Sequence, residues 1–372
     1  MSWPSESDLE SIDSIIERMN PILNFPYPMK SSKNETFPKS KGDPWIGAYT
    51  KNGYWYRLSW GGKEDWDEIV PEISYRSGFL KDSKSAEIYK NVLKPSAELK
   101  LLVVKNIRGE VLGCAEIVVY SKFTIFGSLF VNEDFRHVGI GMTMMIELVK
   151  EHHVIAMNSV SYLLSSAEKK FGLVPRICRR ILRITIHQPQ GFENLKSSLP
   201  DIIVKSKSSL TSEDYSEISK YSESLNHPKI DWSAYPNIHA VFNENEKCVG
   251  VAVLQEIQND KDILPQLYFS PIYADSEELV EVLMSSSLRK YYNPEDDYDF
   301  DVDYSAIYRR TVDFYVFSEN LDTSFYKNII KKLSPSKTEI HPQFLQTCSN
   351  FLLPSTTHAK VWALSDPNIF LY

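Results

Sequence analysis

The sequence predicts an α+β protein (an α/β three-layer arrangement) built from two domains of similar fold. Three observations support this prediction. The chain has 372 residues, which is long for one domain and comfortable for two. Strand-like and helix-like segments alternate between residues 54 and 175. A similar series of segments then recurs after residue 200.

The elements follow one another in the order β-α-(α)-β-β-β-α-β-α. A strand is expected at 54–60, a helix with acidic residues in its first turn at 63–74, and irregular or helical chain to about 95. Three strands should follow at 98–105, 108–121 and 123–131, joined by tight turns. A helix begins near residue 140. The last two elements are a strand at 154–160 and a helix at 161–175 that ends at Gly172.

Three pairs of segments indicate a duplication. KEDWDEIVPEIS at 63–74 resembles SEDYSEISKYSE at 212–223, and EVLGCAEI at 110–117 resembles KCVGVAVL at 247–254. GSLFV at 127–131 resembles PQLYF at 265–269, in the same order along the chain. The sequence therefore predicts an N-terminal extension at 1–53 and two domains at 54–190 and 191–372. Within the extension, residues 8–18 can form a short amphipathic helix.

Composition narrows the class of protein. An apolar fraction of 42% allows a substantial core, and a net charge of -8 argues against a nucleic-acid partner. The four cysteines are far apart, so neither a disulfide framework nor a metal site is expected. No apolar run approaches a membrane span, and the acidic N-terminus does not look like a signal peptide. We expect a cytoplasmic protein without a membrane partner.

The segment VNEDFRHVGIGMTMM, residues 131–145, is the strongest indication of a binding site. A strand leads into R-x-x-G-x-G and then a helix, whose first N–H groups and partial positive charge suit a phosphate. Glycine lets a ligand approach the main chain, and Arg136 can add a charge-assisted hydrogen bond. The Rossmann and P-loop patterns are absent. A tight structural turn is the alternative interpretation.

Residues Arg136 to Gly141 resemble the acyl-CoA-binding motif [RQ]-x-x-G-x-[GA] of the GNAT N-acetyltransferase superfamily. FGL at 171–173 is similar to the terminal G-F of that family. The likeness covers residues 54–190 well and the second half weakly, as in tandem-GNAT proteins with a degenerate second copy. It implies two GNAT-like domains, each a mixed, mostly antiparallel sheet flanked by helices. The implied cofactor is acetyl-CoA or another acyl-CoA.

The resemblance also implies which residues contact the cofactor. The pantetheine arm would pair with the end of the fourth strand, and the diphosphate would lie on the loop and helix start. An N–H near Val131 would polarise the thioester carbonyl. The residues carried over in this way are Leu129, Phe130, Val131, Arg136, His137, Val138, Gly139, Ile140, Gly141 and Met142.

Acyl transfer to an amine needs a base, because an alkyl amine is mostly protonated at pH 7, and a donor for the leaving thiolate. The family often supplies the donor from a tyrosine, whose matching position here is Glu168. Glu116, among apolar residues in a predicted strand, is the best candidate base, and Tyr120 lies on the same face. For Glu116 and Tyr120 the alternative is an exposed or paired strand residue. For Glu168 it is a solvated helix carboxylate.

The second copy lacks R-x-x-G-x-G. Aligning Phe269 with Val131 places Ala274 where Arg136 lies, and puts Glu277 and Glu278 in the first turn of the helix, where they would repel a diphosphate. We expect this half not to bind CoA. The acidic segment 293–304 lacks the glycine and glutamate of a calcium loop. It is either a solvated loop or an electrostatic lure for a cationic amine.

The function predicted from the sequence is acyl-CoA-dependent N-acyl transfer, with acetyl-CoA favoured as donor. The acceptor would be an amine of a small molecule or a peptide. The alternative is a catalytically inactive pseudoenzyme that binds acyl-CoA as a ligand or sensor. The sequence does not predict the acceptor, the acyl length or the oligomeric state.

Overall fold

A computed structural model of the chain describes residues 46–49, 55–77, 79–106, 108–136, 139–151, 154–160, 164–187, 190–258, 266–292, 311–317, 323–333, 338–341, 345–350, 360–364 and 370. The helix expected at 8–18 and the acidic segment 293–304 lie outside these residues. Strand β1 (Ile46–Tyr49) falls within the expected N-terminal extension and pairs with β2 (Trp55–Trp60).

The first half continues with two helices and three antiparallel strands. These are α2 (Lys63–Ser77), α3 (Ser85–Leu93), β3 (Ala97–Asn106), β4 (Val111–Tyr120) and β5 (Thr124–Val131). A short 3-10 turn (Glu133–Phe135) precedes α4 (Ile140–Glu151), and β6 (Ile155–Val160) then pairs in parallel with β5. The last elements of this half are α5 (Leu164–Phe171) and the long β7 (Val174–His187).

The second half repeats this order of elements, except that a 3-10 turn (Trp232–Ala234) stands among its described residues where the first half has α3. It runs through β8 (Ile202–Ser206), α6 (Ser212–Ser224), β9 (Ile238–Asn243), β10 (Cys248–Ile257), β11 (Gln266–Ala274), α7 (Glu277–Tyr292) and β12 (Thr311–Phe317). As in the first half, the pairing is antiparallel until β12 joins β11 in parallel. The chain ends with α9 (Ser324–Leu333), β13 (Thr338–Ile340), β14 (Leu345–Ser349) and β15 (Val361–Ala363).

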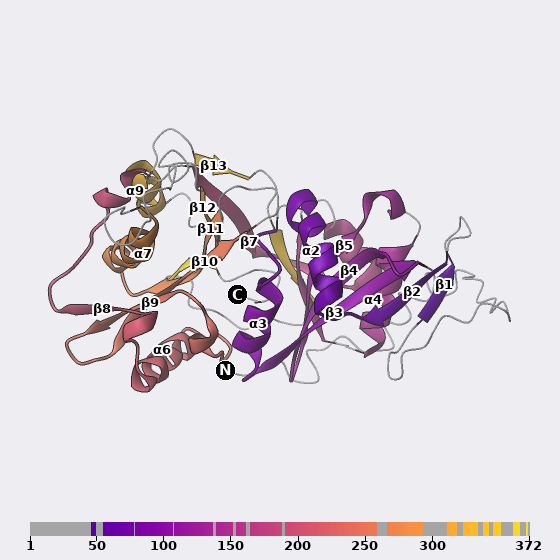
Figure 1. Ribbon diagram of the computed structural model, residues 1–372, viewed down its shortest axis with the longest axis horizontal. Helices are drawn as coiled ribbons and strands as arrows, with labels where there is room; N and C mark the ends of the chain where they lie inside the picture. The colour runs from indigo at the N-terminus through magenta and orange to yellow at the C-terminus, as the bar shows by residue number, and fades with distance from the viewer. Residues whose placement is uncertain are drawn as a thin grey trace.

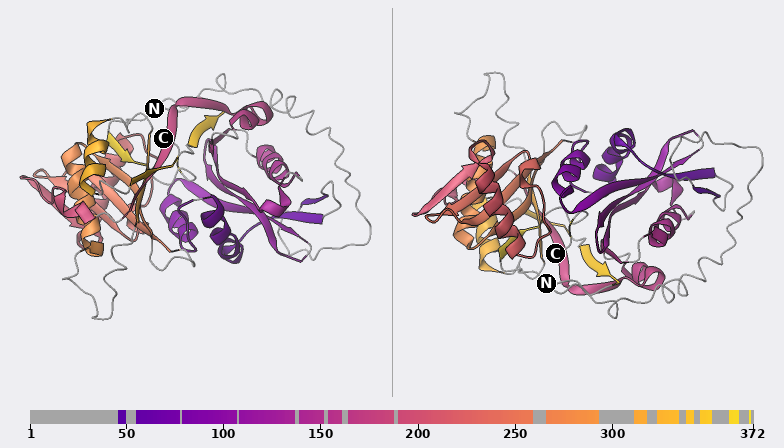
Figure 2. Two further views of the ribbon diagram at one scale, coloured as in Figure 1. Left: turned by 90° about the horizontal axis from the view of Figure 1, so that it is seen from above. Right: turned by 90° about the horizontal axis from the view of Figure 1, so that it is seen from below.

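Helices cover both faces of the sheet in the first half (Figure 2). On one face, Ile69 and Ile73 of α2 pack against Val103, Cys114 and other side chains of β3 to β5. On the other face, α4 and α5 contribute Met144, Met145, Leu148, Ala167 and Phe171 to a separate core cluster. The α4 pattern, with apolar residues three and four apart, forms this buried stripe. The expected three-layer α+β class is confirmed.

The two halves share one continuous sheet (Figure 1), with the strand order β1-β2-β3-β4-β5-β6-β14-β7-β12-β11-β10-β9-β8. Strand β7 connects them, since residues 174–181 pair with β14 and residues 181–187 pair with β12. Strand β14, from the C-terminal part of the chain, lies between β6 and β7. The division at 190/191 stays a proposal, and β14 adds a segment from beyond it to the sheet of the first half.

Candidate functional site

Strands β5 and β6 diverge part-way along their length. They pair in parallel at Thr124, Ile125 and Phe126, and the described residues show no pairing between them from Gly127 onward. Strand β4 holds the other edge of β5, with a register shift that sets Glu116 opposite Gly127 and Ser128. Between β5 and β6 there is therefore an open main-chain edge that leads toward Val131 and the start of α4.

Two glycines, Gly139 and Gly141, lie at the start of α4, and the structure gives a conformational reason for only the first. Gly139 has φ +101°, a conformation that side chains of L-residues rarely adopt, so this position needs glycine for its own backbone. Its carbonyl accepts the N–H of Thr143 at 2.9 Å. A Cβ added to Gly141 would meet, among the described atoms, only Val131 Cγ2 at 3.6 Å, an ordinary contact. Packing therefore does not require glycine at 141.

Arg136 is exposed and held beside the end of β5. Its Nε donates to the carbonyl of Val131 at 3.0 Å, and its Nη1 lies 3.9 Å from Glu133. Because both side chains of that ion pair are largely exposed, the pair is weak, and the guanidinium end remains available to an anion. Of the cofactor residues named from the sequence, His137 and Val138 lie outside the described residues.

The second half has a corresponding pair of diverging strands but lacks the loop that carries R-x-x-G-x-G. Strands β11 and β12 pair at Leu267, Tyr268 and Phe269 and then separate, and β10 has a matching register shift. This register matches Phe269 with Phe126, and Ala274 with Val131. The alignment of Phe269 with Val131 is therefore wrong by five residues. Only Asp275 and Ser276 join β11 to α7, so the second half lacks the loop that carries R-x-x-G-x-G.

In the second half the gap between the diverging strands is filled by the chain itself. Strand β15 pairs with Ile272 and Tyr273 of β11, and Leu364 bridges to Tyr315 of β12. The indole of Trp362 donates to the carbonyl of Ala274 at 2.9 Å. The gap between β11 and β12, which corresponds to the gap between β5 and β6, is thus closed by residues 361–364.

Glu116 is buried at the open gap of the first half. Its side chain is 1% exposed and forms an ion pair with Lys81, whose side chain is 0% exposed. The other carboxylate oxygen, Oε1, has no hydrogen-bond partner among the described residues. The hydroxyl of Ser128, across the register shift, is buried and likewise without a partner there. Unpaired buried polar atoms are costly in a stable core, so they favour a functional interpretation.

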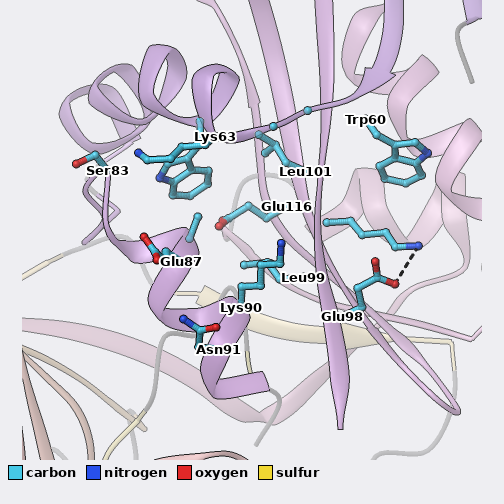
Figure 3. Close-up of a pocket in the computed structure, with 15 residues that line it drawn as sticks. Trp60, Lys63, Ser83, Glu87, Lys90, Asn91, Glu98, Leu99, Leu101 and Glu116 are labelled. Atoms are coloured by element: carbon cyan, nitrogen blue, oxygen red, sulfur yellow. Dashed lines mark ion pairs between the residues drawn. The ribbon is translucent and has the colours of Figure 1, made fainter. Parts of the chain in front are cut away.

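A cavity of about 740 Å³ lies above Glu116, between α2, α3 and β3 (Figure 3). Two indoles, of Trp60 and Trp66, form part of its wall. Charged side chains of both signs line it, namely Lys63, Glu87, Lys90, Glu98, Lys100 and Glu116. Of these, Lys63 pairs with Asp67, and Lys100 pairs with Glu98. The carboxylate of Glu116 is the buried acidic group of this cavity.

The three catalytic candidates do not come together. Tyr120 lies beyond the point where β5 and β6 pair, in the core between the two halves, with its ring stacked on Phe123. Burial, with a smaller effect from Tyr273, raises the pKa of Tyr120 above its ordinary value, so the hydroxyl stays protonated. Glu168 is exposed on α5, which packs on the opposite face of the sheet from Glu116.

Lys81 is the site residue that sequence reasoning missed. It lies in FLKDSKS, a stretch interpreted only as irregular or helical chain. The two apolar residues before it are the one local sign that this connection turns inward. Nothing local indicates that its ammonium reaches a strand 35 residues away, because that contact depends on how α2 and α3 pack on the sheet.

Comparisons with known proteins place this geometry in a known fold. A putative acetyltransferase from Pyrococcus horikoshii superposes with a TM-score of 0.58 at 13% identity, over 85% of this chain and 96% of that one. A tandem GNAT protein from the clavulanic acid biosynthesis pathway gives 0.54 at 10% identity, over 81% and 99%. A GCN5-related N-acetyltransferase from Sphaerobacter thermophilus gives 0.50 at 10%, over 81% and 97%.

The chain has the GNAT fold. Each likeness covers more of the chain than either half contributes, so the GNAT fold extends over both halves. No protein-family profile matches the sequence. No curated protein matches it either. Among the described residues, no helix is long and apolar enough to cross a membrane.

Proposed function

We propose that the chain is an acyl-CoA-dependent N-acyltransferase of the cytoplasm, with acetyl-CoA as the favoured donor and an amine of a small molecule or peptide as acceptor. The observation that carries this proposal is the open gap between β5 and β6, which leads to a glycine-bearing helix start. The acetyltransferases that share the fold are consistent with it.

The residues present fit an acyl-CoA. The free edge of β5 offers the main-chain groups of Leu129, Phe130 and Val131 to an extended arm. The first turn of α4, from Ile140 to Met142, offers N–H groups to a diphosphate, and Gly141 leaves space for its approach. Arg136 adds a charged group to the proposed contact, and the resemblance assigns His137 and Val138 to the same contact. When bound, acyl-CoA supplies an acyl group on a good leaving group.

Calorimetric titration with CoA and acetyl-CoA tests the binding part of this proposal. We expect wild-type protein to bind both, and Gly141→Asp to lose binding at least tenfold, since a carboxylate would occupy the place of the diphosphate. An acidic residue in the first turn of a helix is otherwise favourable, so the melting temperature should not fall. Equal affinity in wild type and Gly141→Asp would contradict the proposed cofactor site.

A second candidate is a protein that binds acyl-CoA without transferring the acyl group. The exposed position of Glu168, where the family often has a tyrosine, favours it. A thiol-release assay over amines, amino acids and peptides separates the two candidates. Release of CoA that depends on the acceptor supports the enzyme, and tight binding with no release for any acceptor supports the sensor.

A further inference from the structure

Two buried hydroxyl groups support the start of α4 from inside the first half. They belong to Tyr56 on β2 and Thr143 on α4, which are 0% and 8% exposed. The phenol oxygen of Tyr56 and Oγ1 of Thr143 lie 2.8 Å apart. This contact joins a strand to the helix that follows the glycine motif, across 87 residues of sequence. It therefore depends on tertiary packing, and the sequence alone does not indicate it.

The hydrogen bonds form a chain that runs from Tyr56 through Thr143 to Gly139. A threonine hydroxyl has one hydrogen to donate. The Thr143 hydroxyl donates it to the carbonyl of Gly139 at 3.1 Å, so the phenol of Tyr56 is the donor in its own bond to Thr143. The N–H of Thr143 donates to the same carbonyl at 2.9 Å. The carbonyl oxygen of Gly139 therefore accepts two hydrogen bonds, which occupy both of its lone pairs.

The peptide unit between Gly139 and Ile140 is the one that this chain fixes. Glycine has wide freedom in both backbone angles, and Gly139 has a φ of +101°, so this unit would otherwise turn easily. A trans peptide unit is planar, and its C=O and N–H groups point in opposite directions. Holding the Gly139 carbonyl toward Thr143 therefore holds the N–H of Ile140 pointing out of the start of α4. There it has no acceptor within the helix.

Stability alone does not account for the two hydroxyl groups. Tyr56 belongs to an apolar core cluster that also contains Leu58, Met144 and Met145. A phenylalanine and a valine would fill nearly the same space without burying two hydroxyls. Replacing both partners of a buried hydrogen bond by apolar groups of the same shape is close to neutral for stability. The pair of hydroxyls therefore calls for a role other than stability.

We propose that Tyr56 and Thr143 are positioning residues for the diphosphate of CoA. Their hydrogen bonds hold the peptide unit between Gly139 and Ile140 with its N–H directed at the diphosphate site before the ligand binds. The inference rests on the proposed function. Neither side chain contacts the ligand, and both act through the carbonyl of Gly139. A peptide unit that is already ordered does not lose conformational freedom on binding, so the chain of hydrogen bonds contributes to affinity.

Calorimetric titration of CoA into the full-length protein and four variants tests this role. Thr143→Val should weaken CoA binding about tenfold, because the Gly139 carbonyl keeps only one of its two donors. Tyr56→Phe breaks only the first bond of the chain and should weaken binding about threefold. The double variant should bind as Thr143→Val does, since both changes act on the same chain. Thr143→Ser keeps the hydroxyl and should restore most of the affinity lost in Thr143→Val.

Two further measurements separate positioning from a general loss of structure. In phosphorus NMR spectra at saturating CoA, Thr143→Val should move the diphosphate signals toward their positions in free CoA and leave the 3′-phosphate signal in place. The double variant should melt close to the wild-type temperature, because it removes both hydroxyls and keeps the packing. Tyr89→Phe is the matched control. It removes another buried phenol, which bonds to Gln255 at 3.0 Å, and should leave CoA affinity unchanged.

The outcomes separate the inference from the proposed function. Wild-type affinity and unmoved diphosphate signals in Thr143→Val would overturn the positioning role and leave the cofactor site standing. A loss of CoA affinity in Tyr89→Phe as large as that in Tyr56→Phe would also overturn it, since the effect would then be one of general stability. A wild-type protein that does not bind CoA would overturn the proposed function, and the inference with it.

Discussion

At the scale of single residues, Gly139, just before α4, and Gly141, in its first turn, give opposite predictions for stability. Gly139→Ala should destabilise the protein by about 1 kcal/mol or more, because alanine is strained at φ +101°. Gly141→Ala should stabilise it by up to about 1 kcal/mol, because alanine favours the helix and its Cβ meets only an ordinary contact. Urea unfolding of both variants measures these changes.

Gly141→Ala also distinguishes an effect on stability from an effect on ligand binding. Gly141→Ala should weaken CoA binding although it raises stability, since its methyl group faces the proposed diphosphate. A Gly141→Ala protein that is more stable and binds CoA as well as wild type would show that the glycine serves neither purpose. Gly139 would then be the only glycine of the motif whose presence has a physical explanation, namely its positive φ.

Two buried histidines predict how stability depends on pH. Burial lowers the pKa of His227 to about 4, and burial together with Lys290 lowers that of His239 to about 4. In the unfolded chain both rings bind a proton below about pH 6.5. The folded state therefore loses stability as the pH falls from 6.5 toward 4, by about 1.4 kcal/mol per pH unit for each ring.

Unfolding in urea at pH 7 and pH 5 tests this dependence. His227→Phe keeps an aromatic ring near Trp232 and Phe370 but cannot bind a proton. Its loss of stability between the two pH values should be smaller than that of wild type by about 2 kcal/mol. An equal loss of stability between pH 7 and pH 5 in the two proteins would show that His227 does not stay neutral in the folded state.

At the scale of elements, local patterns predicted most of the first half. The strands expected at 98–105, 123–131 and 154–160 are β3, β5 and β6, with ends that differ by at most one residue. The glycine motif indicated where α4 begins. By contrast, β14 and β15 were not predicted, because five- and three-residue strands have too little periodicity and their partners lie far away in sequence.

The candidate site likewise has a part that the sequence predicted and a part that it could not predict. Residues of the cofactor motif are contiguous, so the sequence could group them. Glu116 was identified from its apolar neighbours, but its partner Lys81 and the cavity depend on tertiary packing. The second half illustrates the limit of pattern matching, since β11 could be aligned with β5 from the sequence but the register could not be predicted.

Strand β15 gives a prediction of its own. Trp362 is half-buried against Phe325, with ring centroids 4.6 Å apart, and it donates to Ala274. Trp362→Ala should cost about 2 to 3 kcal/mol through lost packing and an unsatisfied carbonyl. Lys360→Met removes a neighbouring exposed ion pair with Asp275 and should cost at most about 1 kcal/mol. Urea unfolding compares the two variants, and equal costs would contradict a packed role for β15.

At the scale of the whole molecule, the halves depend on each other. Every residue of β14 is buried, between β6 on one side and β7 on the other. A fragment that ends at residue 190 would expose both edges, which are templates for pairing with other chains. We therefore expect it to aggregate or to remain without a cooperative transition. Size-exclusion chromatography and thermal circular dichroism test this. A monomeric fragment that unfolds cooperatively would sink the prediction.

The position of β14 also fixes an order of events during synthesis. Residues 174–187 leave the ribosome about 160 residues before β14 does, an interval of about 10 to 30 s at ordinary translation rates. During this interval, β6 and the first part of β7 cannot pair with β14, which lies between them in the finished protein. The nascent first half therefore has two unpaired strand edges during this interval. Codon changes that slow translation between residues 187 and 345 should lower the soluble yield without altering the finished protein.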